Sequence, residues 1–282
     1  QVERRNGIDV STPSVPQYNA IFINQPKQNI FDDIEVREAL AHAIDKNTLI
    51  ERALNGLATP VDSFILPGML GENPEITKYE YSTQRAIELL EEEGWELAEG
   101  EGVRSNGTSS LRFTLTVLNN AELIAVAEEI QDQLLEIGMD MQIETVDSAT
   151  FQDETLRNRE YDAILSGELY AIDPDPYAFW HSSQATFPNL NLSGFANRDA
   201  DNLIEAGRIE TNREDRIKDY TELQDIIIED IPAVFLYQPQ YLYPHTSKLN
   251  TESLQQIAQQ SHRFSNIHEW YIKIRRSLSL TK

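Results

Sequence analysis

The sequence predicts an α/β lobe built on a mixed β-sheet flanked by helices. Three observations lead to this prediction. Segments with strand and helix periodicity alternate along most of the 282 residues. One strand–helix–strand unit, between residues 111 and 146, has the spacing of a βαβ crossover. Hydrophobic residues make up 40% of the chain, which is enough for the core of one large domain or two small ones.

The first third of the chain predicts a strand followed by helices. "YNAIFIN", at 18–24, alternates and is rich in β-forming residues. The run at 31–56 has apolar residues at helical spacing, an aspartate N-cap and a closing glycine, so we expect one helix. A loop rich in proline and glycine follows at 57–81, and a helix capped by Ser82 is expected at 82–94.

The βαβ unit is the clearest architectural signal. "LRFTLTVL" at 111–118 and "MDMQIETV" at 139–146 have strand patterns, and an amphipathic helix at 121–138 connects them. A right-handed crossover is expected for such a connection. We expect a further strand at 161–169 to share the same sheet.

The last third predicts two helices and more strands. The helices are expected at 197–211 and 212–230, and a strand is expected at 269–276. "VFLYQPQYLYP" is typical of strand structure, and its alternation predicts that one face carries four aromatic residues: Phe235, Tyr237, Tyr241 and Tyr243.

Composition excludes several classes of function. Acidic residues outnumber basic ones 47 to 23, giving a net charge of −24, which argues against nucleic acid and anionic membranes as partners. The absence of cysteine excludes thiolate metal sites and a cysteine nucleophile. No run approaches the roughly 18 apolar residues of a membrane span, and no signal peptide is visible. Because the chain opens without a clear helix or strand, we expect it to begin inside a longer protein.

The stretch "LYAIDPDPYAFWHSSQ" at 169–184 concentrates unusual chemistry. It follows the strand predicted at 161–169, and open α/β sheets bind ligands beyond the carboxyl ends of their strands. A plain turn is the alternative, because Asp175 before Pro176 makes a good helix N-cap, and the aromatic residues also fit core packing. The candidate ligand-binding residues are Glu168, Leu169, Tyr170, Ile172, Asp173, Tyr177 and Trp180.

Neither a metal, a cofactor nor a catalytic residue is expected in this stretch. A calcium site would need more oxygen ligands in loop register. No GxSxG elbow occurs in the chain, so the serines near His181 lack the setting of a hydrolase nucleophile.

The order of the segments resembles the C-terminal lobe of the extracytoplasmic solute-binding proteins of ABC importers, in the dipeptide/oligopeptide-binding branch called family 5. The resemblance covers about residues 18–245. The stretches that carry it are "FDDIEVREALAHAIDKNTLI" with "LNGLATP", "AELIAVAEEIQDQLLEIGMDMQIETVD", "YDAILSGELYAIDPDPYAFW", "NRDADNLIEAGR" and "EDIPAVFLYQPQYLY".

This resemblance implies a lobe of the type II periplasmic-binding-protein fold, in a clamshell that holds its ligand between two lobes. Residues 1–17 would be a linker from an N-terminal lobe, 18–245 the C-terminal ligand-binding lobe, and 246–282 a tail that returns toward the N-terminal lobe. The implied protein is a monomer that binds a peptide or similar small solute and delivers it to ABC permease subunits. It would work outside the cytoplasm, in the periplasm or as a cell-surface lipoprotein.

The resemblance also singles out one departure. Peptide-binding members pair the ligand's α-ammonium with the first aspartate of a pattern like Asp-x-x-Asp-Pro. Here Asp175-Pro176 ends that pattern, and Ile172 takes the place of the first aspartate. Asp173 is one position along and would have to substitute, so sugars, opines and modified peptides stay open as ligands.

Two other functions are considered besides the solute-binding lobe. One is a carboxylate-dependent hydrolase that uses Asp173 with Asp175 or Glu168, since paired carboxylates can serve as acid and base. The other is a receptor module that senses a peptide and transports nothing.

Overall fold

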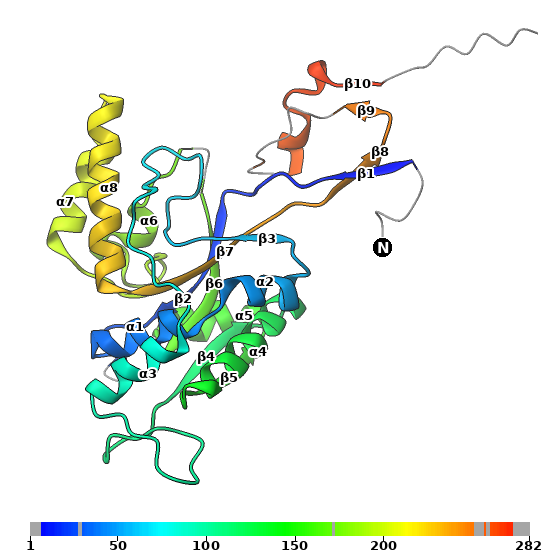
Figure 1. Ribbon diagram of the computed structural model, residues 1–282. Helices are drawn as coiled ribbons and strands as arrows, with labels where there is room; N and C mark the ends of the chain where they lie inside the picture. The colour runs from blue at the N-terminus through cyan, green and yellow to red at the C-terminus, as the bar shows by residue number, and fades with distance from the viewer. Residues whose placement is uncertain (1–6, 28–29, 171–172, 251–256, 258–259, 273–282) are drawn as a thin grey trace, which may run out of the picture.

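The computed structural model describes residues 7–27, 30–170, 173–250, 257 and 260–272. A six-stranded mixed sheet lies at its centre, with the strand order β3-β7-β2-β6-β4-β5 (Figure 1). Strand β4 is parallel to both of its neighbours, and the other pairs are antiparallel. The strands are β2 (Gln17–Ile23), β3 (Ala58–Pro60), β4 (Arg112–Leu118), β5 (Asp140–Val146), β6 (Ala163–Leu169) and β7 (Ala233–Pro239).

The predicted α/β class and the βαβ unit are confirmed. Strands β4 and β5 pair in parallel from Arg112 with Asp140 to Leu118 with Val146, and β4 also pairs with β6. The three segments predicted to share one sheet therefore do so. The connecting helix α4 (Ala121–Glu136) is capped by the side chain of Asn120, which accepts hydrogen bonds from two backbone N–H groups.

Helices cover both faces of the sheet. One face packs against α1 (Ile34–Ala43), α2 (Lys46–Leu54), α3 (Thr83–Glu92) and α4. The other packs against α6 (Tyr177–Trp180), α7 (Arg198–Ile209), α8 (Arg213–Asp230) and residues 61–76 of the long loop, at the upper left of Figure 1. After β5 the chain forms the short α5 (Ser148–Thr150) and a π-helix at Phe151–Leu156.

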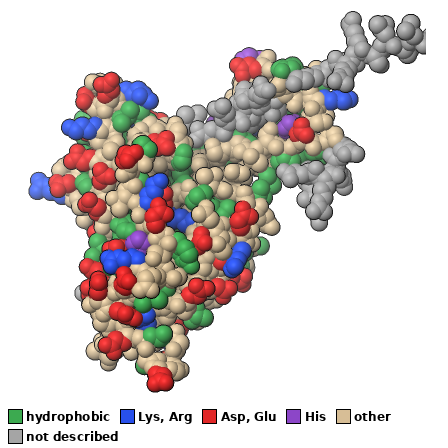
Figure 2. Space-filling view, viewed as in Figure 1, with side chains coloured by type: hydrophobic (Ala, Val, Ile, Leu, Met, Phe, Trp, Pro, Cys, Tyr) green, Lys and Arg blue, Asp and Glu red, His purple; other side chains and the backbone are tan. Residues whose placement is uncertain are grey.

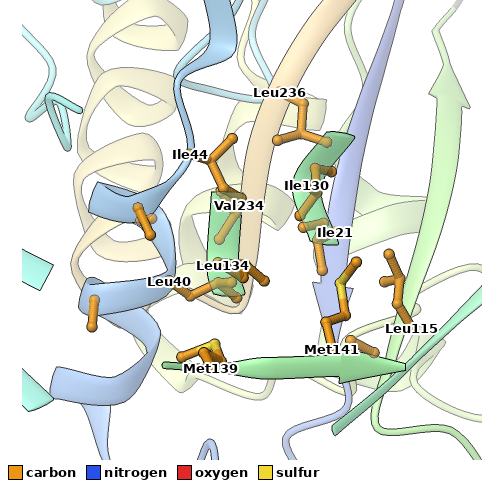
Figure 3. Close-up of a cluster of buried hydrophobic side chains, with 14 of the residues drawn as sticks. Ile21, Leu40, Ile44, Leu115, Ile130, Leu134, Met139, Met141, Val234 and Leu236 are labelled. Carbon is orange, nitrogen blue, oxygen red and sulfur yellow. The ribbon is translucent and has the colours of Figure 1, made fainter. Parts of the chain in front are cut away.

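The two faces hold separate hydrophobic clusters, and strand β2 contributes to both. Ile21 and Ile23 belong to the first cluster, while Tyr18 and Phe22 belong to the second. Figure 3 shows the first cluster, in which Leu40 and Ile44 lie on the helical side. A strand that is apolar on both faces belongs in the middle of a sheet, and β2 is such a strand.

The single helix predicted at 31–56 is two helices. The backbone of Ile44 is extended, and the carboxylate of Asp45 accepts hydrogen bonds from the N–H groups of Asn47 and Thr48. Asp45 therefore caps a new helix, α2, where the sequence pattern suggested continuation. The hydrophobic spacing hid this break because both helices bury residues in the same cluster.

The prediction of one aromatic face on residues 235–243 is wrong. Phe235 packs in the second hydrophobic cluster and Tyr237 in the first. The cause is a register shift in which Asn19 pairs with Tyr237 while Ala20 pairs with Phe235. This bulge places one extra residue in β7 and changes the side to which the following side chains point.

Outside the large sheet, β1 (Ile8–Ser11) pairs with β8 (Tyr243–Thr246) and extends away from the lobe (Figure 1). A second small sheet joins β9 (Leu249–Asn250) to β10 (Tyr271–Ile272). Of the strand predicted at 269–276, Tyr271 and Ile272 form a strand, Glu269 ends a 3-10 helix, and residues 273–276 lie outside the described residues. Short 3-10 helices occur at Ser182–Gln184, Gln260–Phe264 and Ile267–Glu269. The proposed division at residues 17 and 245 stays a prediction.

Within the described ranges, no helix combines the length and the apolar character needed to cross a membrane.

Candidate ligand-binding site

The candidate site begins where β6 ends. Strand β6 runs antiparallel to β2, so Glu168 pairs with Tyr18 and Leu169 with Gln17. The N–H of Tyr170 then donates to the carbonyl of Pro16 at 2.8 Å. The sheet therefore holds the chain up to Tyr170 and positions the loop that follows.

Glu168 is a buried carboxyl group at the base of this loop. Its side chain is on the face of the second hydrophobic cluster, with 3% of the residue exposed. Oε2 accepts a hydrogen bond from the hydroxyl of Tyr18, while Oε1 has no hydrogen-bond partner among the described residues. Burial raises the pKa of Glu168 well above its ordinary value, and the hydrogen bond from Tyr18 opposes this only in part. The folded lobe therefore favours the neutral form of Glu168 more than the unfolded chain does.

Tyr170 lies in the same buried environment, which argues against its candidacy for direct ligand contact. Only 4% of the residue is exposed, and its ring packs edge-on against Phe179 at a centroid distance of 5.3 Å. Burial raises the pKa of its hydroxyl, and the nearby Glu168 adds to the effect. Tyr170 faces inward because it lies two residues beyond Glu168 and the strand alternates.

Trp180 is a core residue, against its candidacy for ligand contact. None of it is exposed, and its ring packs between Phe22 at 6.1 Å and Phe64 at 5.6 Å. Leu169 is the reverse case, with 51% of the residue exposed. The structure thus places an acid inside and a leucine outside at the end of β6.

The loop carboxylates meet two arginines from the α7–α8 pair. Arg216 Nη1 lies 2.9 Å from Asp173 Oδ1 and 3.1 Å from Oδ2. Arg208 Nε lies 3.1 Å from Asp175 Oδ2. Asp175 Oδ1 also accepts from the N–H of Tyr177 at 3.1 Å, as the turn interpretation expects. Ile172 lies outside the described residues.

Tyr177 is half-buried and lies beneath one of these arginines. The Arg208 guanidinium stacks over its ring, 4.2 Å from the centroid. Its hydroxyl is 3.2 Å from Ser183 Oγ. Three of the described candidates are therefore exposed or half-buried, namely Leu169, Asp173 and Tyr177. The other three are buried, namely Glu168, Tyr170 and Trp180.

Sequence reasoning did not identify Arg208, Arg216 or Tyr18 as parts of the site. Tyr18 could have been found from the register of β2 against β6, but nothing local marks the arginines. No cluster of three His, Cys, Asp or Glu residues suited to a metal ion occurs in the part of the chain that the structure describes.

Two cavities occur elsewhere on the lobe, in the loop predicted at 57–81. They measure about 190 and 170 Å³ and share the residues Pro60, Asp62 and Lys78. Lys46 Nζ donates to Asp62 Oδ1 at 2.6 Å and to the carbonyl of Val61 at 2.9 Å. Each cavity is smaller than the roughly 300–1,000 Å³ of typical small-molecule pockets.

A mixed sheet with a loop beyond a strand end, flanked by helices on both faces, is the architecture of one lobe of a type II periplasmic binding protein. A sequence model for "Bacterial extracellular solute-binding proteins, family 5 Middle" matches residues 1–190. The chain belongs to this family of solute-binding proteins.

Relatives in this family differ in the ligands that their names state. The oligopeptide-binding protein AppA of Bacillus subtilis is 28% identical over 275 residues, covering 96% of this chain and 49% of AppA. The nickel-binding periplasmic protein of Escherichia coli is 33% identical over 155 residues, covering 54% and 29% of the two chains. The chain thus spans about half the length of AppA and a smaller share of the nickel-binding protein.

Solved structures agree with the fold. The Bacillus subtilis AppA structure, in complex with a nonapeptide, matches with a TM-score of 0.79 at 26% identity and covers 96% of this chain and 54% of that one. The DppA structure from Helicobacter pylori, in complex with the peptide STSA, has a TM-score of 0.77 at 25% identity and covers 96% and 50%. The predicted family and fold class are therefore confirmed.

Because its carboxyl group is buried, Glu168 should make the free energy of unfolding of the lobe depend on pH. Its pKa in the folded lobe is above the ordinary value of 4.5, so the folded state binds the proton more tightly than the unfolded state. This contribution is full below about pH 4.5 and is lost as pH rises toward the folded pKa, by up to about 1.4 kcal/mol per pH unit. In urea denaturation from pH 4 to 8, Glu168→Gln should lack that part of the slope. The exposed Glu160→Gln should retain it, and equal slopes in Glu168→Gln and the parent would contradict the prediction.

Proposed function

We propose that this chain is the C-terminal lobe of the substrate-binding component of an ABC importer, and that it holds a peptide or similar small solute against a second lobe. The observation that carries the proposal is the match to AppA over 96% of this chain, in both sequence and fold. Permease subunits of the importer would be its partners, and its place of action would be outside the cytoplasm.

The loop after β6 is the proposed ligand side of the lobe. It leaves the sheet at a strand's carboxyl end, as binding loops of α/β proteins do. This region offers an apolar group from Leu169, an acidic group from Asp173 and an aromatic group from Tyr177. The buried side chains of Glu168 and Tyr170 lie beneath the loop and support it. We propose ligand contact for the first three and a supporting role for the other two.

The test is native mass spectrometry of a two-lobed protein that contains this chain, purified without denaturation, followed by calorimetry with the solute identified. A co-purifying peptide that rebinds after removal would support the proposal. A metal chelate or haem in its place would redirect the ligand class, and a turnover product released from peptides would favour the hydrolase over the binding lobe.

A free α-ammonium is expected to matter less here than in peptide binders of this kind. Ile172 stands where the family resemblance places the ammonium-binding aspartate, and an ion-assisted hydrogen bond there would contribute about 1.5–3 kcal/mol. Asp173 faces Arg216. Free and N-acetylated versions of one peptide should therefore bind within about tenfold of each other. A hundredfold preference for the free amine would show that another acid has taken that role.

A further inference from the structure

Two arginines connect the ligand loop to a pair of helices far from it in sequence. Arg216, in the first turns of α8, contacts both carboxylate oxygens of Asp173 at 2.9 and 3.1 Å. Arg208, near the end of α7, contacts Asp175 at 3.1 Å and also stacks over Tyr177. The loop is thus attached at two points, one on each helix.

Arg216 is itself held by the core. Its side chain is 17% exposed, and Nη2 donates to the hydroxyl of Tyr220 at 3.1 Å. Tyr220 is fully buried in the second hydrophobic cluster. A surface ion pair between free side chains contributes little, because both must be ordered. Here one partner is already ordered, so less entropy is lost when Asp173 pairs with it.

Tyr220 lies where α7 and α8 pack closely against each other. A Cβ atom at Gly207 of α7 would lie 2.3 Å from the Tyr220 ring, so the two helices approach closely at this glycine. Gly71, at φ +87°, packs against the same residue, where a Cβ would lie 2.8 Å from Tyr220 Cβ. The base from which Arg216 reaches the loop is therefore tightly packed.

The charges around the loop require counterions. Helix α8 carries seven acidic residues and three basic ones. Burial raises the pKa of Asp219, and repulsion from neighbouring acidic residues raises it further. Figure 2 shows acidic and basic side chains mixed over the part of the lobe where α7 and α8 lie. Asp173 and Asp175 bring two more negative charges to this surface, and Arg208 and Arg216 balance them one for one.

We propose that Arg208 and Arg216 are positioning residues that hold the loop at 173–177 against α7 and α8, and that these two ion pairs leave the loop without a net charge to offer a ligand. The inference rests on the proposed function only in naming that surface as the ligand side. The ligand group received there would be uncharged, such as an amide or an acylated amine.

Hydrogen–deuterium exchange of the 282-residue chain tests the positioning without any ligand. Arg216→Gln and Arg208→Gln should each speed the exchange of loop and α6 amides by about threefold or more. The informative amides are those of Tyr177, Phe179, Trp180 and His181. The exposed arginines at the starts of the same helices provide matched controls, Arg213→Gln and Arg198→Gln, which should leave these rates unchanged. Equal rates in all four variants would overturn the proposal.

A charge swap separates positioning from a general loss of stability. Arg216→Asp and Asp173→Arg should each speed exchange, and the double variant should return it to within about twofold of the parent, because the pair is rebuilt in reverse. Additive acceleration in the double variant would show that the pair has no positioning role.

A peptide pair tests the charge. In NMR titrations at millimolar concentration, the parent chain should bind a nine-residue alanine–serine peptide about equally with a free or an N-acetylated terminus. Arg216→Gln frees the Asp173 carboxylate and should shift the ratio about tenfold toward the free amine. An unshifted ratio would overturn the neutral-surface part of the proposal. If neither peptide binds the parent, the proposed peptide function fails, while the exchange experiment still decides the positioning role.

Discussion

Replacing Trp180 with alanine is expected to lower the free energy of unfolding by about 3–5 kcal/mol. The side chain is fully buried and contacts aromatic rings from β2, β7 and the loop after β3. Its removal leaves a cavity between elements that cannot all move inward, since the sheet fixes two of them. Because domains are stable by only about 5–15 kcal/mol, this loss is a large share of the total.

Urea denaturation monitored by far-ultraviolet circular dichroism measures this effect. Tyr81→Ala is the matched control, because this aromatic residue is 47% exposed and its loss should change stability by about 0.5 kcal/mol or less. A Trp180→Ala variant as stable as the parent would mean that the indole ring is not part of the core, and ligand contact would again be its best assignment.

Local patterns predicted most of the fold. The βαβ unit was predictable because Met139 and Met141 alternate with polar residues, and both are fully buried. The break at Asp45 was not, since a capping residue inside an amphipathic run looks like one more surface residue. The bulge in β7 was not either, because it depends on how Asn19 and Ala20 meet that strand. Pairing between distant segments leaves no mark in either segment alone.

The sequence predicted where the candidate site lies, but it did not predict which of its side chains are buried. Hydrophobicity alone would put Leu169 inside and Glu168 outside at the end of "AILSGEL", yet the structure does the reverse. The strand faces are regular, and Leu169 lies on the side of Leu165 but is 51% exposed. An acid buried against a local rule is the kind of inconsistency expected near functional sites. Its role as a support for the loop follows only once Tyr18 is seen opposite it.

The isolated chain is expected to fold by itself but to bind its ligand about a thousandfold more weakly than a two-lobed protein that contains it. Independent folding is expected because the lobe has hydrophobic clusters on both faces of its sheet, closed by their own helices. Binding differs, since each lobe of a clamshell supplies part of the contact, and closure excludes water from the hydrogen bonds. This expectation rests on the proposed function and on the fact that the chain covers 49% of AppA.

The expected size of the loss follows from affinity arithmetic. If the two-lobed protein binds at about 1 μM, its binding free energy is near −8 kcal/mol, and half of that corresponds to about 1 mM. The loss of translational freedom on capture is the same for one lobe as for two, so a single lobe has fewer contacts to offset the same cost. Calorimetry of the chain alone, and of the chain joined to an N-terminal lobe, with one peptide measures both constants. Equal micromolar constants for the two forms would place the whole binding site within this lobe and would contradict the two-lobed proposal, because a second lobe would then add nothing to capture.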